Sequence, residues 1–355
     1  MPNKIIRLLF SSLFVLIFSG AHAQIHARFA DSLMIQYEVP ELAYAVISSD
    51  SVLEMSVGGI TKIHTDRHAC LNDRFRIGSN TKTITTFIAA ELVKKGLINW
   101  NSRLIDVCPD LKQYCKSDYV DLTLLQLLSF RSKLLSWTYT NAAPPSISNN
   151  VPEEEQRYQF IRWALQQPPA ANNKGFSFSN PGYVVAGLML ERVSGKLYKD
   201  LVADLGKRLD ISFGFGAPNL SDSLQPWGHN ADLIPEPPTE NPKLNWLLPA
   251  GNVNVSLPDY IKYIQLHLKG LRGQSNLLSR KEFEFLHYGL PEFALGWFWN
   301  ETKGHKLSNH TGNPGTFLSE VVIDSDNNRA YILFANAQTE NTIEAFDVLL
   351  TALMK

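Results

Sequence analysis

The sequence is short of cysteine, of surplus basic charge and of glycine-rich loops. Its 355 residues include three cysteines, and 33 lysines and arginines stand against 34 aspartates and glutamates. Because the formal net charge is −1 and no long basic run occurs, nucleic acid and acidic membranes are not expected partners. The odd cysteine count argues against a disulfide-dependent fold, although Cys108 and Cys115 are close enough in sequence to close a small loop in an oxidising compartment.

Signals for cofactors are also missing. The chain has neither a glycine-rich phosphate loop nor a G-x-S-x-G nucleophile elbow. His64, His68 and Cys70 lie close together in "HTDRHAC", but no fourth metal ligand accompanies them. We therefore interpret this stretch as a connection between elements, and we expect neither a metal nor a cofactor.

The first 23 residues, "MPNKIIRLLFSSLFVLIFSGAHA", are the exception to an otherwise moderate hydropathy. Lys4 and Arg7 precede an apolar run over residues 8–18, which ends before Ala21-His22-Ala23. This layout predicts a secretory signal peptide with cleavage after Ala23. The alternative is a single membrane anchor, but the apolar run is shorter than a membrane span requires. The mature chain is thus expected to be periplasmic or secreted and to have no membrane contact.

The order of strand and helix patterns predicts the fold class. Strand patterns occur near both ends, in "LAYAVISSDSVLEMSVGG" and in "FLSEVVIDSDNNRAYILFAN", and the intervening patterns are mostly helical. We predict a mixed α/β fold in which an antiparallel sheet, built from both chain termini and flanked by terminal helices, carries a large inserted all-helical lobe. The predicted domain is 24–355, with a sheet lobe at about 24–78 and 290–355 and a helical lobe at about 79–289.

Ser79 and Lys82 lie where the sheet lobe passes into the helical lobe. In "RFRIGSNTKTITTFIAAELVKKG" a polar turn is followed by an apolar helical pattern that ends at Gly96. Ser79 is at the N-terminus of this helix and Lys82 is one turn further, although a lysine there opposes the helix dipole. A lysine in an apolar cleft has a lowered pKa and can accept the serine proton. The alternative is a serine N-cap followed by a solvated lysine.

Three motifs in sequence order resemble those of one known superfamily. "FRIGSNTK" resembles the Ser-x-x-Lys nucleophile motif of the penicillin-binding proteins and class C β-lactamases, which are serine hydrolases. "FSFSNPGYVVAGLMLERVSG" resembles their second motif, usually Tyr-x-Asn, and "NHTGNPGTF" resembles their third, Lys-Thr-Gly or His-Thr-Gly. "LLPAGNVNVSLPDYIKY" and "FALGWFW" match connecting blocks. The resemblance covers nearly the whole mature chain.

The resemblance assigns roles to the first two motifs. It implies that Ser79 is the nucleophile, that Lys82 is its proton acceptor, and that Asn180 orients Lys82 and the substrate amide. The alternative for Asn180 is a plain helix cap before Pro181, and both roles are compatible.

For the third motif, the resemblance places His310 facing the substrate, on an edge strand opposite the serine. It implies that Thr311 and Gly312 contact the substrate, Gly312 by letting the substrate backbone lie against the strand. The N–H groups of Asn313 and Ser79 would form the oxyanion hole. The alternative for His310 is a histidine on a strand surface.

Two departures from the family pattern affect the expected chemistry. Phe178 stands where the motif tyrosine belongs, and a phenyl ring has no proton to exchange. Lys82 would then act alone or with His310, whose ordinary pKa near 6.5 suits proton transfer; Tyr183 is a weaker substitute because the family uses that position for packing. In "LLSFRSKLL", Phe130 and Lys133 replace the usual histidine and glycine, so we expect a reshaped loop over the cleft.

Two functional hypotheses follow. The first is an exported serine hydrolase, monomeric and without cofactor, that forms an acyl-enzyme with a β-lactam, a D-amino-acid peptide of the cell wall or a small ester. It would deacylate slowly because Phe178 replaces the tyrosine. The second is a catalytically silent relative that binds cell-wall peptide or a protein partner in the same cleft. The intact Ser79, Lys82, Asn180 and His310 favour the enzyme.

Overall fold

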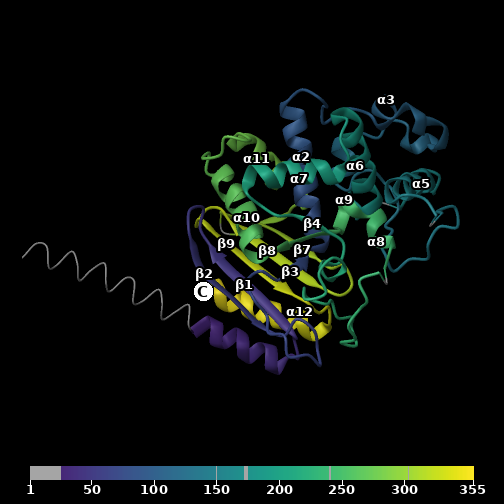
Figure 1. Ribbon diagram of the computed structural model, residues 1–355. Helices are drawn as coiled ribbons and strands as arrows, with labels where there is room; N and C mark the ends of the chain where they lie inside the picture. Colours follow the sequence, from purple (N-terminus) through teal and green to yellow (C-terminus); the bar gives the residue numbers. More distant parts are fainter. Residues whose placement is uncertain (1–24, 149, 172–174, 240, 303) are drawn as a thin grey trace, which may run out of the picture.

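The computed structural model describes residues 25–148, 150–171, 175–239, 241–302 and 304–355 (Figure 1). The predicted signal peptide lies outside these residues. No helix in the described ranges is both long and apolar enough to cross a membrane.

One six-stranded antiparallel sheet joins the two ends of the chain. Its strand order is β2-β1-β9-β8-β7-β6. The contact between the two ends is the pairing of β1 with β9, in which Leu42 lies opposite Ala335. The strands are β1 (Glu41–Ile47), β2 (Val52–Gly59), β6 (Phe298–Thr302), β7 (His305–Gly312), β8 (Leu318–Asp324) and β9 (Arg329–Ala335). The predicted mixed fold with an antiparallel sheet built from both termini is confirmed.

The two faces of this sheet bury different sets of side chains. Because side chains alternate along a strand, Leu42 and Tyr44 of β1 face one side while Ala43 and Ala45 face the other. The first face is covered by the helix over residues 25–36 and by α12 (Glu340–Leu353), which lie next to each other against the sheet (Figure 1). This confirms that terminal helices flank the sheet.

The other face of the sheet packs against α10 (Leu257–Leu271), which contacts β1 and β9. Tyr260 of α10 lies with its ring centre 5.4 Å from that of Phe334 on β9. Part of the segment 79–289 therefore covers the sheet.

The inserted segment also contributes strands, and in this respect the structure differs from the all-helical lobe that we predicted. A small sheet has the order β3-β5-β4, with β3 (Arg74–Arg76), β5 (Val253–Ser256) and β4 (Gly214–Phe215). Strands of two to four residues are too short to produce a readable alternation, which is why the sequence did not predict them.

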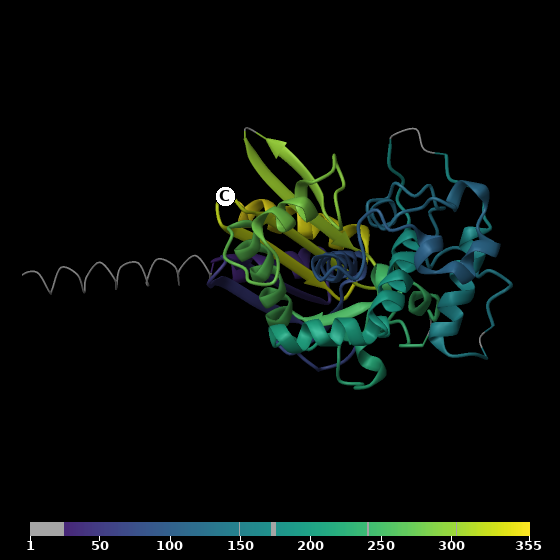
Figure 2. The same ribbon diagram turned by 90° about the horizontal axis from the view of Figure 1, so that it is seen from above.

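The helices between residues 104 and 194 gather to one side of the large sheet, where Figure 2 shows them in blue and teal. At the centre of the molecule, α2 (Thr81–Lys94) is buried over most of its length and carries Lys82. The others are α3 (Leu104–Val107), α4 (Leu124–Leu128), α5 (Glu153–Leu165), α6 (Asn180–Ser194), α7 (Tyr198–Leu209), α8 (Lys243–Trp246), α9 (Leu248–Gly251) and α11 (Arg280–Tyr288).

All three cysteines are free thiols, so Cys108 and Cys115 do not form the small disulfide loop in this structure. Cys108 is buried, and burial raises the pKa of its thiol to about 12. A thiol with such a high pKa is inert at neutral pH.

Candidate active site

Ser79 lies in a 3₁₀ turn, Gly78–Asn80, that leads directly into α2. Gly78 has φ +49°, and a Cβ at this position would lie 2.6 Å from the backbone nitrogen of Asn313. The turn can therefore approach the end of β7 this closely only because residue 78 has no side chain. This contact brings the backbone next to Ser79 close to that of Asn313, although the two residues are 234 positions apart in the sequence.

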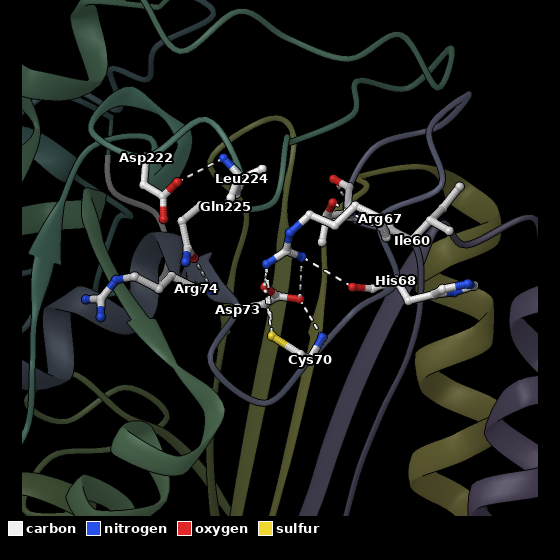
Figure 3. Close-up of polar contacts among 11 residues, drawn as sticks. Ile60, Arg67, His68, Cys70, Asp73, Arg74, Asp222, Leu224 and Gln225 are labelled. Carbon is white, nitrogen blue, oxygen red and sulfur yellow. Dashed lines mark hydrogen bonds and ion pairs between the residues drawn. The ribbon is translucent and has the colours of Figure 1, made fainter.

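The connection that leads into β3 and this turn is held by a buried carboxylate (Figure 3). Asp73, whose side chain is fully buried, accepts hydrogen bonds from Arg67 Nη2 at 2.8 Å and from the Cys70 backbone N–H at 2.6 Å. Cys70 Sγ also lies 3.4 Å from Asp73 Oδ1. Within the described ranges, no group of three or more His, Cys, Asp and Glu side chains is placed to hold a metal ion.

Lys82 is fully buried and has three polar neighbours. Its Nζ lies 2.9 Å from Ser79 Oγ, 2.8 Å from Asn180 Oδ1 and 2.7 Å from the carbonyl oxygen of Ala250. Burial disfavours the charged ammonium and lowers the pKa of Lys82 to about 7. At neutral pH the free amine is then roughly a thousand times more populated than in an exposed lysine.

The neighbours of Lys82 determine which hydrogen bonds its neutral amine makes. The Asn180 amide is oriented because its Nδ2 donates to the carbonyl of Trp137 at 3.0 Å, which leaves Oδ1 toward Lys82. Asn180 Oδ1 and the Ala250 carbonyl can only accept, so they take the two N–H groups of a neutral amine. The lone pair then faces Ser79 Oγ, the only one of the three neighbours that has a proton to give.

Asn180 is the first residue of α6 and is not its cap. The N-cap is Ser179, whose Oγ accepts from the Gly182 backbone N–H at 3.1 Å and donates to the Leu135 carbonyl at 3.1 Å. Pro181 follows in the first turn, where its missing N–H costs no hydrogen bond. The alternative interpretation of Asn180 as a plain helix cap is therefore wrong, and its side chain is available to Lys82.

Phe178 lies beside Lys82, as the motif alignment predicts. Its side chain is 37% exposed, and its ring centre is 5.3 Å from Lys82 Nζ. The Tyr183 ring is also 5.4 Å from Lys82 Nζ, but its hydroxyl donates to the Leu128 carbonyl at 2.6 Å. Burial raises the pKa of Tyr183 far above its usual value. That hydroxyl is therefore no substitute for the missing tyrosine.

The loop around Phe130 and Lys133, whose sequence departs from the family pattern, has an uncommon backbone conformation. Both residues have φ near +59°, a region that side chains other than glycine rarely adopt. Phe130 is fully buried; its ring is stacked on that of Phe293, with the ring centres 4.1 Å apart, and is tilted against that of Phe178, with the ring centres 5.2 Å apart. Arg131 holds the loop by donating to the carbonyls of Ser129, Phe293 and Pro291.

One edge of β7 is open beside the nucleophile. In the described chain, β7 pairs with β6 only from His305 to Asn309, whereas His310–Gly312 pairs with β8 alone. Thr311 is exposed on this stretch. Gly312 packs so closely that a Cβ there would lie 1.9 Å from the Ile77 carbonyl oxygen. The glycine is thus required by a contact inside the protein, in addition to the substrate contact that the resemblance implies.

His310 is placed differently from our expectation. Its side chain is 2% exposed and packs between the rings of Phe293 and Phe298, whereas we expected it to face the substrate. Its Nδ1 must donate to the Thr311 carbonyl at 2.9 Å, which leaves Nε2 unprotonated and buried without a partner among the described residues. Burial, aided by the nearby Lys82, lowers the pKa of His310 to about 3. The expected pKa near 6.5 is therefore corrected: the imidazole is neutral at ordinary pH.

Comparison with known proteins gives the family and supports the fold. The family model described as Beta-lactamase matches residues 26–353. The Protein flp of Staphylococcus aureus (strain MW2) is 21% identical over 313 residues, which are 85% of this chain and 60% of that protein. This chain therefore spans about three fifths of the length of that curated relative.

Solved structures share the fold at low identity. A D-alanine carboxypeptidase from Burkholderia cenocepacia superposes with a TM-score of 0.73 at 18% identity, over 94% of this chain and 99% of that one. A D-amino acid amidase from Ochrobactrum anthropi SV3 superposes with a TM-score of 0.73 at 18% identity, over 93% and 98% of the two chains. The family match over nearly the whole chain leads to one conclusion: the chain belongs to the β-lactamase family, a family of serine hydrolases.

Proposed function

We propose that the protein is an exported serine hydrolase that forms an acyl-enzyme on Ser79 with an amide or ester substrate. The observation that carries this proposal is the set of three contacts of the buried Lys82 amine with Ser79 Oγ, Asn180 Oδ1 and the Ala250 carbonyl. A neutral amine whose lone pair faces a serine hydroxyl is a general base for that hydroxyl. The mature enzyme is proposed to act in the periplasm or outside the cell as a monomer.

The acylation step uses the Lys82 amine twice. Lys82 takes the proton of Ser79 Oγ while the oxygen attacks the substrate carbonyl. The carbonyl oxygen becomes an oxyanion, which the backbone N–H groups of Ser79 and Asn313 stabilise. When the tetrahedral intermediate collapses, the bond to the leaving nitrogen or oxygen breaks, and the Lys82 ammonium returns its proton to that atom. Lys82 is then neutral again and the acyl group is on Ser79.

The substrate is proposed to lie along the open edge of β7. Backbone groups of His310–Gly312 that have no strand partner on that side can pair with an extended amide, as in the addition of a strand to a sheet. Thr311, exposed on this stretch, is proposed to contact the substrate. D-amino-acid peptides of the cell wall, β-lactams and small esters are the proposed substrate classes, and two relatives of the same fold are named as a D-alanine carboxypeptidase and a D-amino acid amidase.

Deacylation is proposed to be slow. Hydrolysis of the acyl-enzyme needs an activated water, and a tyrosine hydroxyl at position 178 would contribute there. Phe178 supplies none, and His310 is buried with a pKa lowered to about 3, which makes its imidazole a weak base. Lys82 is left as the only basic side chain in contact with Ser79 among the described residues.

Phe178 and His310 are also compatible with the second candidate, a silent relative that binds cell-wall peptide or a protein partner in this cleft. An exposed phenyl ring and a buried histidine would suit a binding site as well as a slow enzyme. The enzyme is preferred because burying Lys82 is unfavourable for stability and has no purpose in a site that only binds.

Treatment of the purified mature protein with a fluorescent fluorophosphonate and with a fluorescent penicillin tests the proposal. We expect a covalent adduct whose tryptic peptide locates it at Ser79, and no adduct in Ser79→Ala. Ser117→Ala, at a serine in a separate 3₁₀ turn, is the matched control and should label normally. If the wild-type protein is folded, as judged by circular dichroism, and is still modified by neither probe, the enzyme hypothesis is refuted and the binding-protein hypothesis remains.

A further inference from the structure

The Ala250 carbonyl, which accepts from Lys82, belongs to a turn that is fixed by a buried arginine. α9 ends at Gly251, and Asn252 links it to β5. Arg76 of β3 donates to Asn252 Oδ1 twice, from Nη2 at 2.7 Å and from Nε at 3.0 Å. These bonds hold the side chain of Asn252, which lies two residues after Ala250, the residue whose carbonyl contacts Lys82.

Arg76 is unusual for an arginine, because its side chain is only 4% exposed. The one ion pair that it makes among the described residues is with Glu236, at 4.0 Å, which is at the limit of such a contact. Its short hydrogen bonds go instead to a neutral amide. Burying a guanidinium in this way is costly, and burial lowers the pKa of Arg76 to about 10. The cost suggests a purpose other than stability.

The Asn252 amide has no freedom to turn. Because Oδ1 accepts from Arg76, Nδ2 is the donor, and it donates to Asn245 Oδ1 at 2.8 Å. Asn245 Nδ2 donates in turn to Glu153 Oε1 at 2.8 Å. The turn between α9 and β5 is thus connected to α8 and α5, so its backbone is fixed from both sides.

We infer that Arg76 and Asn252 are positioning residues for Lys82: they fix the turn that holds the Ala250 carbonyl 2.7 Å from Lys82 Nζ, and thereby keep the amine directed at Ser79. This inference rests on the proposed function of Lys82 as the base for Ser79. Neither residue touches the substrate or Ser79 in the proposed reaction, so neither is a catalytic residue.

The effect on the lysine has a definite sign. A carbonyl acceptor stabilises an ammonium more than an amine, so loosening the Ala250 carbonyl lowers the pKa of Lys82 further. Two other titratable groups near Lys82 in the described part of the chain are His310 of β7 and Tyr183 of α6, and burial keeps both neutral at ordinary pH.

A second pair of an arginine on β3 and an asparagine, Arg74 and Asn254, provides a matched control. Arg74 Nε donates to Asn254 Oδ1 at 2.7 Å, and Arg74 is also held through its backbone N–H by Gln225 Oε1 at 3.0 Å (Figure 3). Asn254 lies in the middle of β5, two residues further from Ala250 than Asn252. The variants Asn252→Ala and Asn254→Ala each remove a side-chain amide that accepts from an arginine of β3.

The experiment compares these two variants by two measurements. The first is the rate of Ser79 acylation by a fluorophosphonate as a function of pH. The second is the titration of Lys82 followed by NMR of ¹³C-labelled lysine, assigned with Lys82→Arg, which needs no turnover. For Asn252→Ala we expect a Lys82 titration roughly half a unit to one unit lower in pH. We also expect acylation about tenfold slower at high pH, where the amine is fully populated in both proteins but is less well directed at Ser79 in the variant. Asn254→Ala should keep the wild-type titration.

Equal titrations of Lys82 in the two variants would overturn the inference. If Asn252→Ala does not fold, Asn245→Ala, which removes only the outer partner of the Asn252 amide, should shift the titration in the same direction, and no shift would count against the inference. Failure of the proposed function is a separate outcome. A wild type without acylation rejects the hydrolase, whereas the NMR comparison still decides whether Arg76 and Asn252 position Lys82.

Discussion

The phenyl ring of Phe178 is centred 5.3 Å from Lys82 Nζ, with nothing on the ring that can exchange a proton. An aromatic ring at this distance favours the ammonium form of the lysine slightly, through its quadrupole. It therefore leaves Lys82 able to cycle between amine and ammonium, but it adds no second acid or base. The site is consequently better equipped for acylation, which needs one base, than for deacylation, which needs a second group to activate water.

Phe178→Tyr is expected to accelerate deacylation. The substitution adds one hydroxyl close to Lys82 at nearly unchanged shape, and loss of a positioned acid–base group typically costs about a hundredfold to ten-thousandfold. With an activated ester, the wild type should show a pre-steady-state burst followed by slow turnover. In Phe178→Tyr the turnover should rise and the burst become smaller.

Phe176→Tyr is the matched control for this experiment, because Phe176 packs against the main core two residues earlier in the chain. It should keep the wild-type burst. A wild type that turns over rapidly without a burst, and that is unchanged by Phe178→Tyr, would show that deacylation uses a base elsewhere.

Asn180→Asp is expected to shift the acylation profile to higher pH. Asn180 Oδ1 lies 2.8 Å from Lys82 Nζ, so a carboxylate there favours the ammonium and raises the pKa of Lys82. The amine is then populated only at higher pH, and acylation at pH 7 should fall by at least tenfold while recovering in alkaline buffer. Stopped-flow acylation between pH 5 and 10 measures this. An unchanged profile would mean that Asn180 does not act on Lys82.

Gly312→Ala is expected to destabilise the protein. The added Cβ would lie 1.9 Å from the Ile77 carbonyl oxygen and 2.5 Å from Ser319 Oγ, so β7 must move away from the turn that carries Ser79. We expect the free energy of unfolding in urea to fall by about 1–3 kcal/mol, as in other overpacked sites. Thr311→Ala, at the exposed neighbouring position, should change it by less than about 0.5 kcal/mol. If Gly312→Ala and the wild type have equal free energies of unfolding, the end of β7 can move away from Ile77 without loss of stability.

The sequence predicted the side chains of the candidate site better than their surroundings. Ser79, Lys82 and Asn180 come together within hydrogen-bond distance, because motif order in a shared fold determines where these side chains lie. The carbonyls of Ala250 and Trp137, which orient Lys82 and Asn180, could not be predicted, because every residue type has a backbone carbonyl that can accept a hydrogen bond.

Burial was the other property that the sequence did not reveal. His310 was expected to face the substrate at an ordinary pKa, yet Phe293 and Phe298, both outside its motif, enclose the ring. Arg76 and Asn252 are in contact although they lie 176 positions apart in the sequence, and no local pattern indicates such a contact. The antiparallel sheet, in contrast, was predictable, because the apolar runs near both termini are short, rich in β-branched residues and separated by polar turns, which is typical of strands.

The pH dependence of Ser79 acylation tests the central claim, that Lys82 is the base, most directly. Because burial lowers the pKa of Lys82 to about 7, the amine is the minor form below that pH and the major form above it. The rate of labelling by a fluorophosphonate should therefore rise with pH through a midpoint near 7 and then level off. Lys82→Arg, which stays charged at every accessible pH, should lose nearly all labelling. A rate that is flat from pH 5 to 9, or a Lys82→Arg variant that is labelled as fast as the wild type, would contradict this role of Lys82.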